Sequence, residues 1–108
     1  MEGIKQFDIF WVQLDPTQGG EITKTRPCAI ISPNEINCCL RTVIIVPITS
    51  TLRDYPFRVP CFVNGKNGEM AVDHIRAIDK SRILRRLGHL TYHEILRIRD
   101  VLNEMFCQ

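Results

Sequence analysis

The sequence predicts a mainly β fold with short helices, in the form of a small twisted barrel closed by a C-terminal helix. Short apolar runs recur along the chain, separated by turn residues such as Gly, Pro and Asn. Residues 91–106, in contrast, carry apolar residues at helical spacing. The 108 residues, 44% of them hydrophobic, suffice for one modest core. We therefore expect residues 1–108 to form a single domain.

In the first half of the chain, residues 7–14 are expected to form a strand that lies deep in the sheet, because both alternating faces are mainly apolar. A Gly-rich loop follows, to about residue 25. Further strands are expected at residues 27–32 and 41–49, with a short helical turn between them. Pro47 inside the latter run indicates an edge, a bulge or a bend.

In the second half, a polar loop at 50–56 is expected to lead into an edge strand at 57–63 and a hairpin-like connection at 64–68. A strand over 70–78, a turn or short helical segment at 79–83 and a short strand at 85–89 are expected to follow. The final helix begins at Thr91, because Thr91 and Glu94 have the spacing of a capping box. Its apolar face covers the barrel of its own chain or forms part of a contact with a partner.

The cysteine pattern and the absence of long apolar runs indicate a cytoplasmic protein. Five cysteines are present, an odd number, and none forms a Cys-x-x-Cys motif, so we expect reduced thiols and no metal site. No run approaches the roughly 20 apolar residues of a membrane helix. The N-terminus also lacks the basic and then apolar layout of a secretory signal.

The distribution of charge is more informative than the net charge of +2. Residues 76–99 contain seven Lys or Arg residues and two acidic ones. Such a cluster can mark the binding surface for a polyanion, although a solvated basic face is the more common explanation.

Three polar segments lie where predicted strands meet loops: residues 25–27 (T-R-P), 47–50 (P-I-T-S) and 73–76 (D-H-I-R), the last placed within a strand. On a small barrel, these strand ends can converge on one concave face. Cleavage of RNA without a metal needs a base for the ribose 2′-hydroxyl, donors that hold the phosphorane, and an acid for the leaving 5′-oxygen.

Arg26, Thr49 and Asp73 are residues of the types that this reaction needs. The alternative interpretation is structural. Arg26 and Arg76 would then form ion pairs with Asp73 or Asp79, and Thr49 would cap a strand end.

Five segments form an ordered set: D-I-F-W-V-Q-L-D-P-T at 8–17, T-R-P and an apolar strand at 25–32, V-P-I-T-S at 46–50, D-H-I-R-A-I-D-K at 73–80, and R-L-G-H-L at 86–90 before the capped helix. The set closely resembles the MazF/PemK/Kid family of toxins, with typical forms D-I-W-x-V-x-L-D-P-T, T-R-P, V-P-x-T-S, D-Q-x-R-x-x-D and K-x-I-G-x-L. The resemblance covers about residues 7–106.

This resemblance implies an SH3-like barrel of the CcdB/PemK type and a homodimer. It also implies sequence-selective cleavage of single-stranded RNA, including mRNA, by an endoribonuclease (mRNA interferase) that needs no metal or other cofactor and halts translation and growth. A cognate antitoxin of the MazE/PemI type would cover the active groove.

By position, the resemblance makes Arg26 the catalytic arginine, Thr49 the residue that binds the scissile phosphate, and Asp73 the acid proposed as base in some members. Further residues expected to bind substrate are Glu21, Ser50, Phe57, Arg53, Arg58 and Arg76.

Two departures from the Kid-type pattern limit this transfer. Gly20 stands where those toxins carry a loop histidine, and Ala71 where they carry an arginine. Arg26 must then bear more of the phosphate's charge, with Arg53 or Arg58 as a possible source of the missing cation.

Two other functions remain open from the sequence. CcdB-like toxins have the same fold and inhibit DNA gyrase by binding, without catalysis, so they need neither Arg26 nor Thr49. An inactive binding module or autoregulatory partner is the third alternative.

Overall fold

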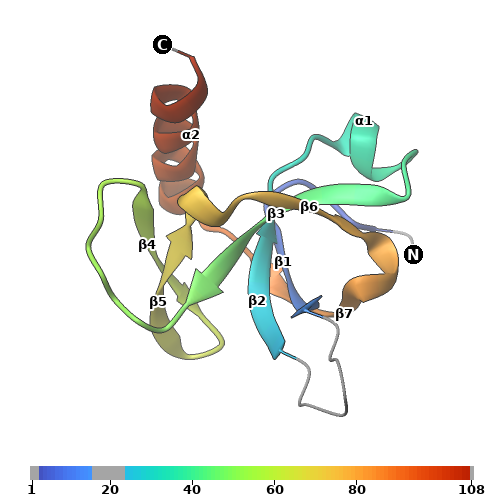
Figure 1. The fold of residues 1–108 in the computed structure, drawn as a ribbon, viewed down its shortest axis with the longest axis horizontal. Coiled ribbons are helices and arrows are strands. Elements are labelled where there is room, and N and C mark those ends of the chain that lie inside the picture. The colour runs from blue at the N-terminus through green and yellow to red at the C-terminus, as the bar shows by residue number, and fades with distance from the viewer. Residues whose placement is uncertain (1–2, 16–23, 108) are drawn as a thin grey trace.

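The computed structural model describes residues 3–15 and 24–107, with the backbone alone at Asp15. The elements in chain order (Figure 1) are β1 (Asp8–Asp15), β2 (Lys24–Ile30), α1 (Asn34–Asn37), β3 (Thr42–Thr49), β4 (Arg58–Val63), β5 (Lys66–Ala71), the 3-10 turn η1 (Val72–His74), β6 (Arg76–Asp79), the 3-10 turn η2 (Lys80–Arg82), β7 (Ile83–His89) and α2 (Tyr92–Phe106). The strands pair antiparallel in the order β4-β5-β3-β2-β1-β7, and β6 pairs with β3. The sheet curls into a half-open barrel, which confirms the predicted fold class.

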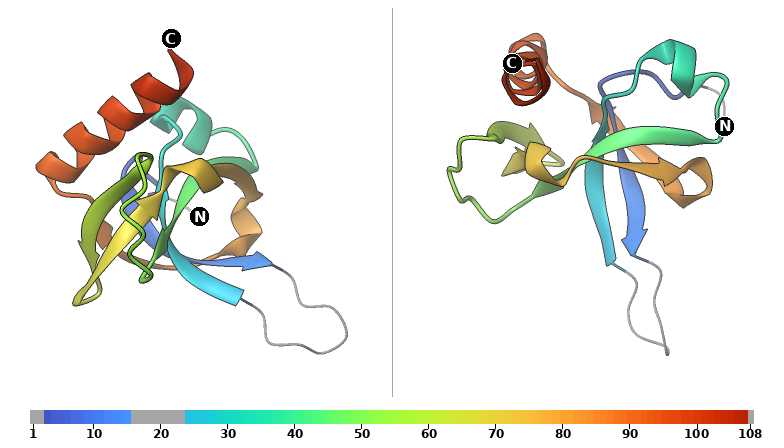
Figure 2. Two further views of the ribbon diagram at one scale, coloured as in Figure 1. Left: turned by 60° about the vertical axis from the view of Figure 1, so that its left-hand side comes forward. Right: turned by 45° about the horizontal axis from the view of Figure 1, so that its top comes forward.

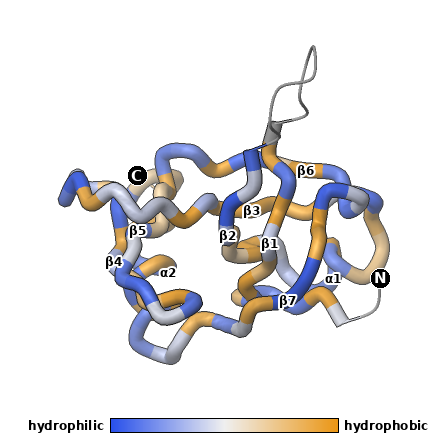
Figure 3. The backbone as a smooth tube through the Cα atoms, turned by 90° about the horizontal axis from the view of Figure 1, so that it is seen from below, coloured by the Kyte–Doolittle hydropathy of each residue, from blue (hydrophilic) through white to orange (hydrophobic). Residues whose placement is uncertain are grey.

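The central strands β1, β2 and β3 bury both of their faces, which explains why their sequences are apolar on both. One face, with Ile9, Ala29 and Val46, belongs to a core that β4, β5 and α2 cover. The other face, with Val12 and Ile30, belongs to a second core closed by β6 and β7. Figure 3 shows the hydrophobic stretches of the central strands in the middle of the molecule, with hydrophilic stretches of β7 outside them. Two cores therefore share one sheet.

Pro47 lies inside β3, where the strand changes its partner on one side. Ile48 and Thr49 pair with β5, and residues 42–45 pair with β6. The Ile44 carbonyl accepts an N–H on the β2 side, so by alternation the nitrogen of Pro47 faces β5 and β6. Proline has no N–H for a continuous ladder there, and the paired strand is interrupted at this point.

This interruption corrects the prediction of one strand over residues 70–78. β5 ends at Ala71, η1 follows, and β6 begins at Arg76. The Val72 N–H donates to the Phe57 carbonyl (3.2 Å) and not to β3. Asp73 and His74 consequently lie on a 3-10 turn that bulges out of the sheet beside Pro47.

The C-terminal helix begins as predicted. Thr91 and Glu94 form a complete capping box, with the Glu94 N–H donating to Thr91 Oγ1 (3.2 Å) and the Thr91 N–H donating to Glu94 Oε1 (2.9 Å). The second carboxylate oxygen of Glu94 accepts the N–H of Phe62 on β4 (3.0 Å). Figure 2 shows α2 crossing beside the β4–β5 hairpin, while the ends of β1 and β2 project from the other side. Glu94 therefore ties the helix to the outer strand.

All five cysteines are free thiols. Cys28 and Cys61 belong to the two cores, and burial raises the pKa of each thiol to about 12. The other three are exposed, so the apolar role expected of the cysteines applies to two of them.

No helix in the described residues has the length and apolar surface that crossing a bilayer requires.

Candidate functional site

The three polar segments meet at one open pocket of about 490 Å³, at the end of the sheet where the second core runs out. The described residues that line it are Leu14, Lys24, Arg26, Pro47, Thr49, Thr51, Arg53, Arg58, Ala71, Asp73, His74, Ile75 and Arg76. We call it the cationic pocket. The expected convergence of the strand ends is therefore present.

Arg26 and Thr49 are brought together by the register of β2 and β3. Cys28 pairs with Pro47, and continuing the same register by two residues places Arg26 opposite Thr49. Because side chains alternate along a strand, both lie on the face that further along forms the second core. The strand ends thus carry polar groups where the apolar face stops.

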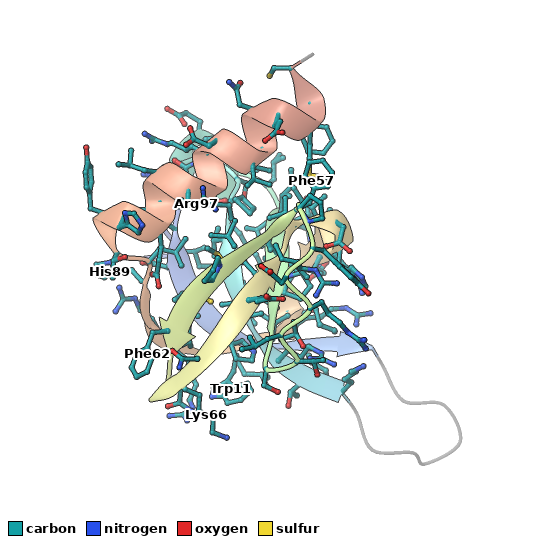
Figure 4. All side chains as sticks on the ribbon, turned by 90° about the vertical axis from the view of Figure 1, so that its left-hand side faces the viewer. Trp11, Phe57, Phe62, Lys66, His89 and Arg97 are labelled. Carbon is teal, nitrogen blue, oxygen red and sulfur yellow. The ribbon has the colours of Figure 1, made fainter. Side chains whose placement is uncertain are left out.

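A second pocket, of about 280 Å³, adjoins the first and shares Lys24, Arg26 and Thr49 with it. Its other described lining residues are Trp11, Thr25, Pro27, Ile48, Ser50, Val63, Asn64, Lys66, Asn67 and Gly68. Figure 4 shows Trp11 and Lys66 together near the tip of the β4–β5 hairpin. We call it the indole pocket, because an aromatic ring and carboxamide groups line it together.

The structural alternative for these residues is only partly met. Thr49 Oγ1 accepts the N–H of Thr51 (3.1 Å), a local cap at the strand end, and its own hydroxyl proton is left to donate. Asp73 pairs with Arg58 and lies 3.4 Å from His74 Nε2, and Asp79 pairs with Arg41. Within the part of the chain that the structure describes, no carboxylate pairs with Arg26.

Asp73 is held by Arg58 in a forked contact. Arg58 Nε donates to Oδ1 (2.8 Å) and Nη2 donates to Oδ2 (3.3 Å). The Arg58 guanidinium holds the pKa of Asp73 below its usual value, and Asp73 raises that of Arg58. The Arg58 side chain is only 9% exposed and stacks over the Tyr55 ring at 5.2 Å. The carboxylate is thus a weak proton acceptor and part of a rigid wall.

Glu69 fixes the loop at residues 50–56, which borders the cationic pocket. Its buried carboxylate accepts the N–H of Arg53 (2.9 Å) and that of Asp54 (3.0 Å), and lies 3.8 Å from Arg58 Nη1. These bonds hold Asp54 in a left-handed conformation (φ 55°). Glu69 is not among the residues expected from the sequence. A charged residue within the buried run 68–72 is the signal that indicates such a partner.

The cationic pocket is built to hold anions. Five of its described lining residues are Lys or Arg, against the single carboxylate of Asp73. The basic run at residues 76–99 does not form this site as a unit. Arg76 alone of its Lys and Arg residues lines the pocket, while Lys80 and Arg82 donate to main-chain carbonyls and Arg86 pairs with Asp8.

Four of the remaining expected residues line one of the two pockets. Ser50 lines the indole pocket, and Arg53, Arg58 and Arg76 line the cationic pocket.

Phe57 lines neither pocket. It packs against the first core, on the side of the molecule towards α2 (Figure 4). Glu21, like Gly20, lies outside the described residues.

Lys24, Thr51 and His74 also line the cationic pocket, and none of them is among the residues expected there from the sequence. His74 directly follows Asp73 in the fourth motif, and this position is the signal by which the sequence could have identified it.

Comparison with known proteins extends these observations. The family described as "PemK-like, MazF-like toxin of type II toxin-antitoxin system" matches residues 5–106. The chain is 29% identical over 97 residues to the endoribonuclease toxin MazF of Escherichia coli K12, covering 89% of this chain and 87% of that protein. It is 27% identical over 111 residues to the endoribonuclease MazF9 of Mycobacterium tuberculosis, covering 92% of each. The structure is similar to MazF in the MazE–MazF (Form-II) crystal structure from Deinococcus radiodurans, with a TM-score of 0.84, 25% identity, and 97% and 96% of the two chains covered.

Proposed function

The chain belongs to the PemK-like, MazF-like toxin family of type II toxin–antitoxin systems, and from this premise we propose that it is an endoribonuclease toxin acting on single-stranded RNA. Its relatives in Escherichia coli and Mycobacterium tuberculosis are endoribonucleases. The observation that carries the proposal is the position of Arg26 and Thr49 at the junction of two adjoining pockets, one cationic and one containing an indole ring.

The chemistry proposed for this junction is attack of a ribose 2′-hydroxyl on the adjacent phosphorus, which needs no metal. Arg26 holds the non-bridging phosphate oxygens with its guanidinium fork, and the Thr49 hydroxyl donates to the same group. Both interactions strengthen as charge builds on the phosphorane, so they lower the barrier.

Asp73 contributes in this proposal as the residue that holds Arg58 at the wall. Its contact with Arg58 and its lowered pKa make it a poor base at neutral pH, so we assign it positioning and not proton abstraction. Arg53 supplies the positive charge that the resemblance required in place of the arginine absent at Ala71. Arg58 is already paired with Asp73, and it offsets the negative charge of that carboxylate beside the phosphate.

The two pockets suit a single strand better than a duplex. A phosphate at Arg26 leaves its neighbouring base beside Trp11, where the ring can stack on the base and amides such as Asn64 can meet the base edge. In a duplex that base would be paired and out of reach. Ser50 and Arg76 extend the contacts on either side.

The proposed partners are a cognate antitoxin and a second copy of the chain. The similar Deinococcus radiodurans protein was solved with MazE, and an antitoxin of that kind would cover the same groove. A groove across a two-fold axis would suit both an RNA strand and an antitoxin segment. The toxin acts on mRNA in the cytoplasm in this proposal.

The test is cleavage of a defined single-stranded RNA by the purified protein, followed by mapping of the 5′-hydroxyl ends. Arg26→Ala should lower the rate at least about 100-fold, because it removes a donor to the transition state. Arg97→Ala, a matched loss of an exposed arginine on α2 (Figure 4), should cleave as the wild type does.

Wild-type protein that leaves RNA intact, or Arg26→Ala that cleaves normally, would contradict the proposal. DNA gyrase inhibition without RNA cleavage would instead favour the CcdB-like alternative, which the similarity to MazF endoribonucleases does not support.

A further inference from the structure

Proton transfer is the part of the proposed reaction for which Arg26 and Thr49 provide no group. The bond from phosphorus to the 2′-oxygen forms as the bond to the 5′-oxygen breaks. The 2′-hydroxyl loses one proton, which passes to solvent water, and the leaving 5′-oxygen must gain one from a donor at the site. A group at the site that carries a transferable proton near neutral pH is therefore required.

The described lining of the cationic pocket offers one such group. Lysine and arginine, as residue types, keep their protons at neutral pH. Asp73 is engaged by Arg58. His74 is the one histidine among the described lining residues, and imidazole is the side chain that ordinarily changes charge between pH 5 and 8.

The His74 ring lies beside a carboxylate that can orient it. His74 Nε2 lies 3.4 Å from Asp73 Oδ2, and Asp73 is itself held by Arg58. Arg58 thus fixes the Asp73 carboxylate, and the carboxylate orients the imidazole of His74, as in other acid–base sites. The His74 side chain is 64% exposed, so a substrate in the pocket can reach it.

The backbone beneath His74 is also fixed. η1 starts from the buried Val72, whose N–H bonds to the Phe57 carbonyl, and the Ile75 N–H donates back to the Val72 carbonyl (3.1 Å). The bulge opposite Pro47 thereby places this ring in the pocket that Arg26 and Thr49 line.

We propose that His74 is the general acid of the reaction, giving its proton to the departing 5′-oxygen, with Asp73 as the residue that positions the ring. This inference rests on the proposed ribonuclease function and deepens it. In the absence of His74, the protein would still bind RNA and would fail at the departure of the leaving group.

The decisive experiment compares two RNA substrates that carry the mapped cleavage sequence. One has the natural 5′-oxygen at the scissile bond, and the other has a bridging 5′-sulfur, which leaves as a thiolate without protonation. His74→Gln introduces the glutamine of the typical D-Q-x-R motif, which is polar and of similar length but cannot act as an acid. The Kid-type toxins carry an arginine at the position of Ala71, and this chain lacks that cation. It should cleave the oxygen substrate at least about 100-fold more slowly than wild type, and the sulfur substrate at nearly the wild-type rate.

Two control variants separate the outcomes. Arg26→Ala should be slow on both substrates, because it weakens the hold on the phosphate itself. His93→Gln, on the exposed surface of α2, should match wild type on both. If His74→Gln cleaves the oxygen substrate normally, or is equally slow on both, His74 is not the general acid. If wild type cleaves neither substrate, the ribonuclease function itself fails, and the role of His74 with it.

Discussion

Gly68 is the residue that allows β5 to pass close to Thr49. A Cβ placed on Gly68 would lie 2.9 Å from the Thr49 carbonyl oxygen and 3.1 Å from Ile48 Cγ2. A carbonyl in a paired strand cannot move without its strand, so Gly68→Ala must displace the end of β3. The close approach that Gly68 permits is therefore part of the site.

We expect Gly68→Ala to destabilise the fold by about 1–3 kcal/mol and to lower RNA cleavage about tenfold or more, because Thr49 moves away from Arg26. Urea unfolding and cleavage rates measure the two effects. Gly65→Ala is the matched control. Gly65 has φ 77° in the hairpin turn and open space around it, so the change costs about 1–2 kcal/mol and leaves cleavage by the folded protein unchanged. Equal cleavage by both variants would contradict this account.

Asp73 stabilises the fold only while it is charged. Arg58 lowers its pKa in the folded state, so its contribution is fully present above the ordinary aspartate pKa of about 3.9 and is lost as the pH falls through the folded value. Its side chain is 38% exposed, so solvent screens the contribution. We expect Asp73→Asn to unfold at lower urea than wild type at pH 7. The difference between the urea midpoints of the variant and the wild type should narrow as the pH is lowered below 4. A difference in urea midpoint that stays constant down to pH 2.5 would mean that the charge of the Asp73 carboxylate does not cause it.

At the scale of elements, the loop at residues 50–56 depends on one carboxylate. Glu69→Gln keeps the shape of the side chain but leaves one oxygen to accept the two N–H groups of Arg53 and Asp54. We expect amide exchange of these two residues to quicken about tenfold, the effect of losing about 1.4 kcal/mol of local stability. Exchange in the β4–β5 turn serves as the internal reference. Unchanged protection at both amides would show that the loop is held by other contacts.

The helix α2 and the outer strand β4 are joined through Glu94. Glu94→Ala removes both the capping-box bond and the bond to Phe62, and should cost about 2–4 kcal/mol in unfolding free energy. Thr91→Ala removes the cap alone and should cost about 1 kcal/mol. Asp100→Ala, which takes an exposed acidic residue from the same helix, should lie close to wild type. Equal losses for the two cap variants would mean that the tie to β4 contributes nothing.

Prediction from sequence succeeded where a local pattern determines the element. Thr91 and Glu94 specify the helix start within four residues, and the apolar run of β1 identifies a deeply placed strand. It failed at residues 72–74, because the break there follows from Pro47 on another strand and from the change of strand partner around it. The residues next to Asp73 in the sequence therefore do not indicate the break.

The candidate site divides in the same way. The motifs at the strand ends predicted Arg26 and Thr49 as site residues, and the register of β2 and β3 brings the two together. The contact between Arg58 and Asp73 joins residues 15 positions apart, and no spacing rule predicts it. Phe57 was expected at the groove because of its alignment alone. Its burial against the first core depends on how the β4–β5 hairpin folds over the sheet.

At the scale of the whole molecule, the net charge of +2 conceals a local concentration of positive charge. Five Lys or Arg residues line one pocket, while other basic residues are used in carbonyl contacts and ion pairs elsewhere. Binding of RNA should therefore depend on salt far more strongly than the overall charge suggests.

We expect the logarithm of the RNA association constant to fall linearly with the logarithm of salt concentration, and Arg53→Ala to reduce the slope by about 0.7. An RNA with a 2′-O-methyl group at the cleavage site permits this titration, because it lacks the attacking hydroxyl. Arg97→Ala should leave the slope unchanged. A slope for Arg53→Ala equal to that of wild type would place Arg53 outside the path of the RNA backbone.

The bond from Phe62 to Glu94 has a consequence for solubility as well as for stability. β4 is an outer strand, and such strands can recruit other chains through their unpaired N–H groups. Along β4, the Arg58 N–H already donates to the Tyr55 carbonyl (3.1 Å), Pro60 has none, and the Phe62 N–H is held by Glu94. Every second position of this edge is thus closed to an incoming strand. The same carboxylate that starts the helix occupies an N–H through which an incoming strand would otherwise pair with β4.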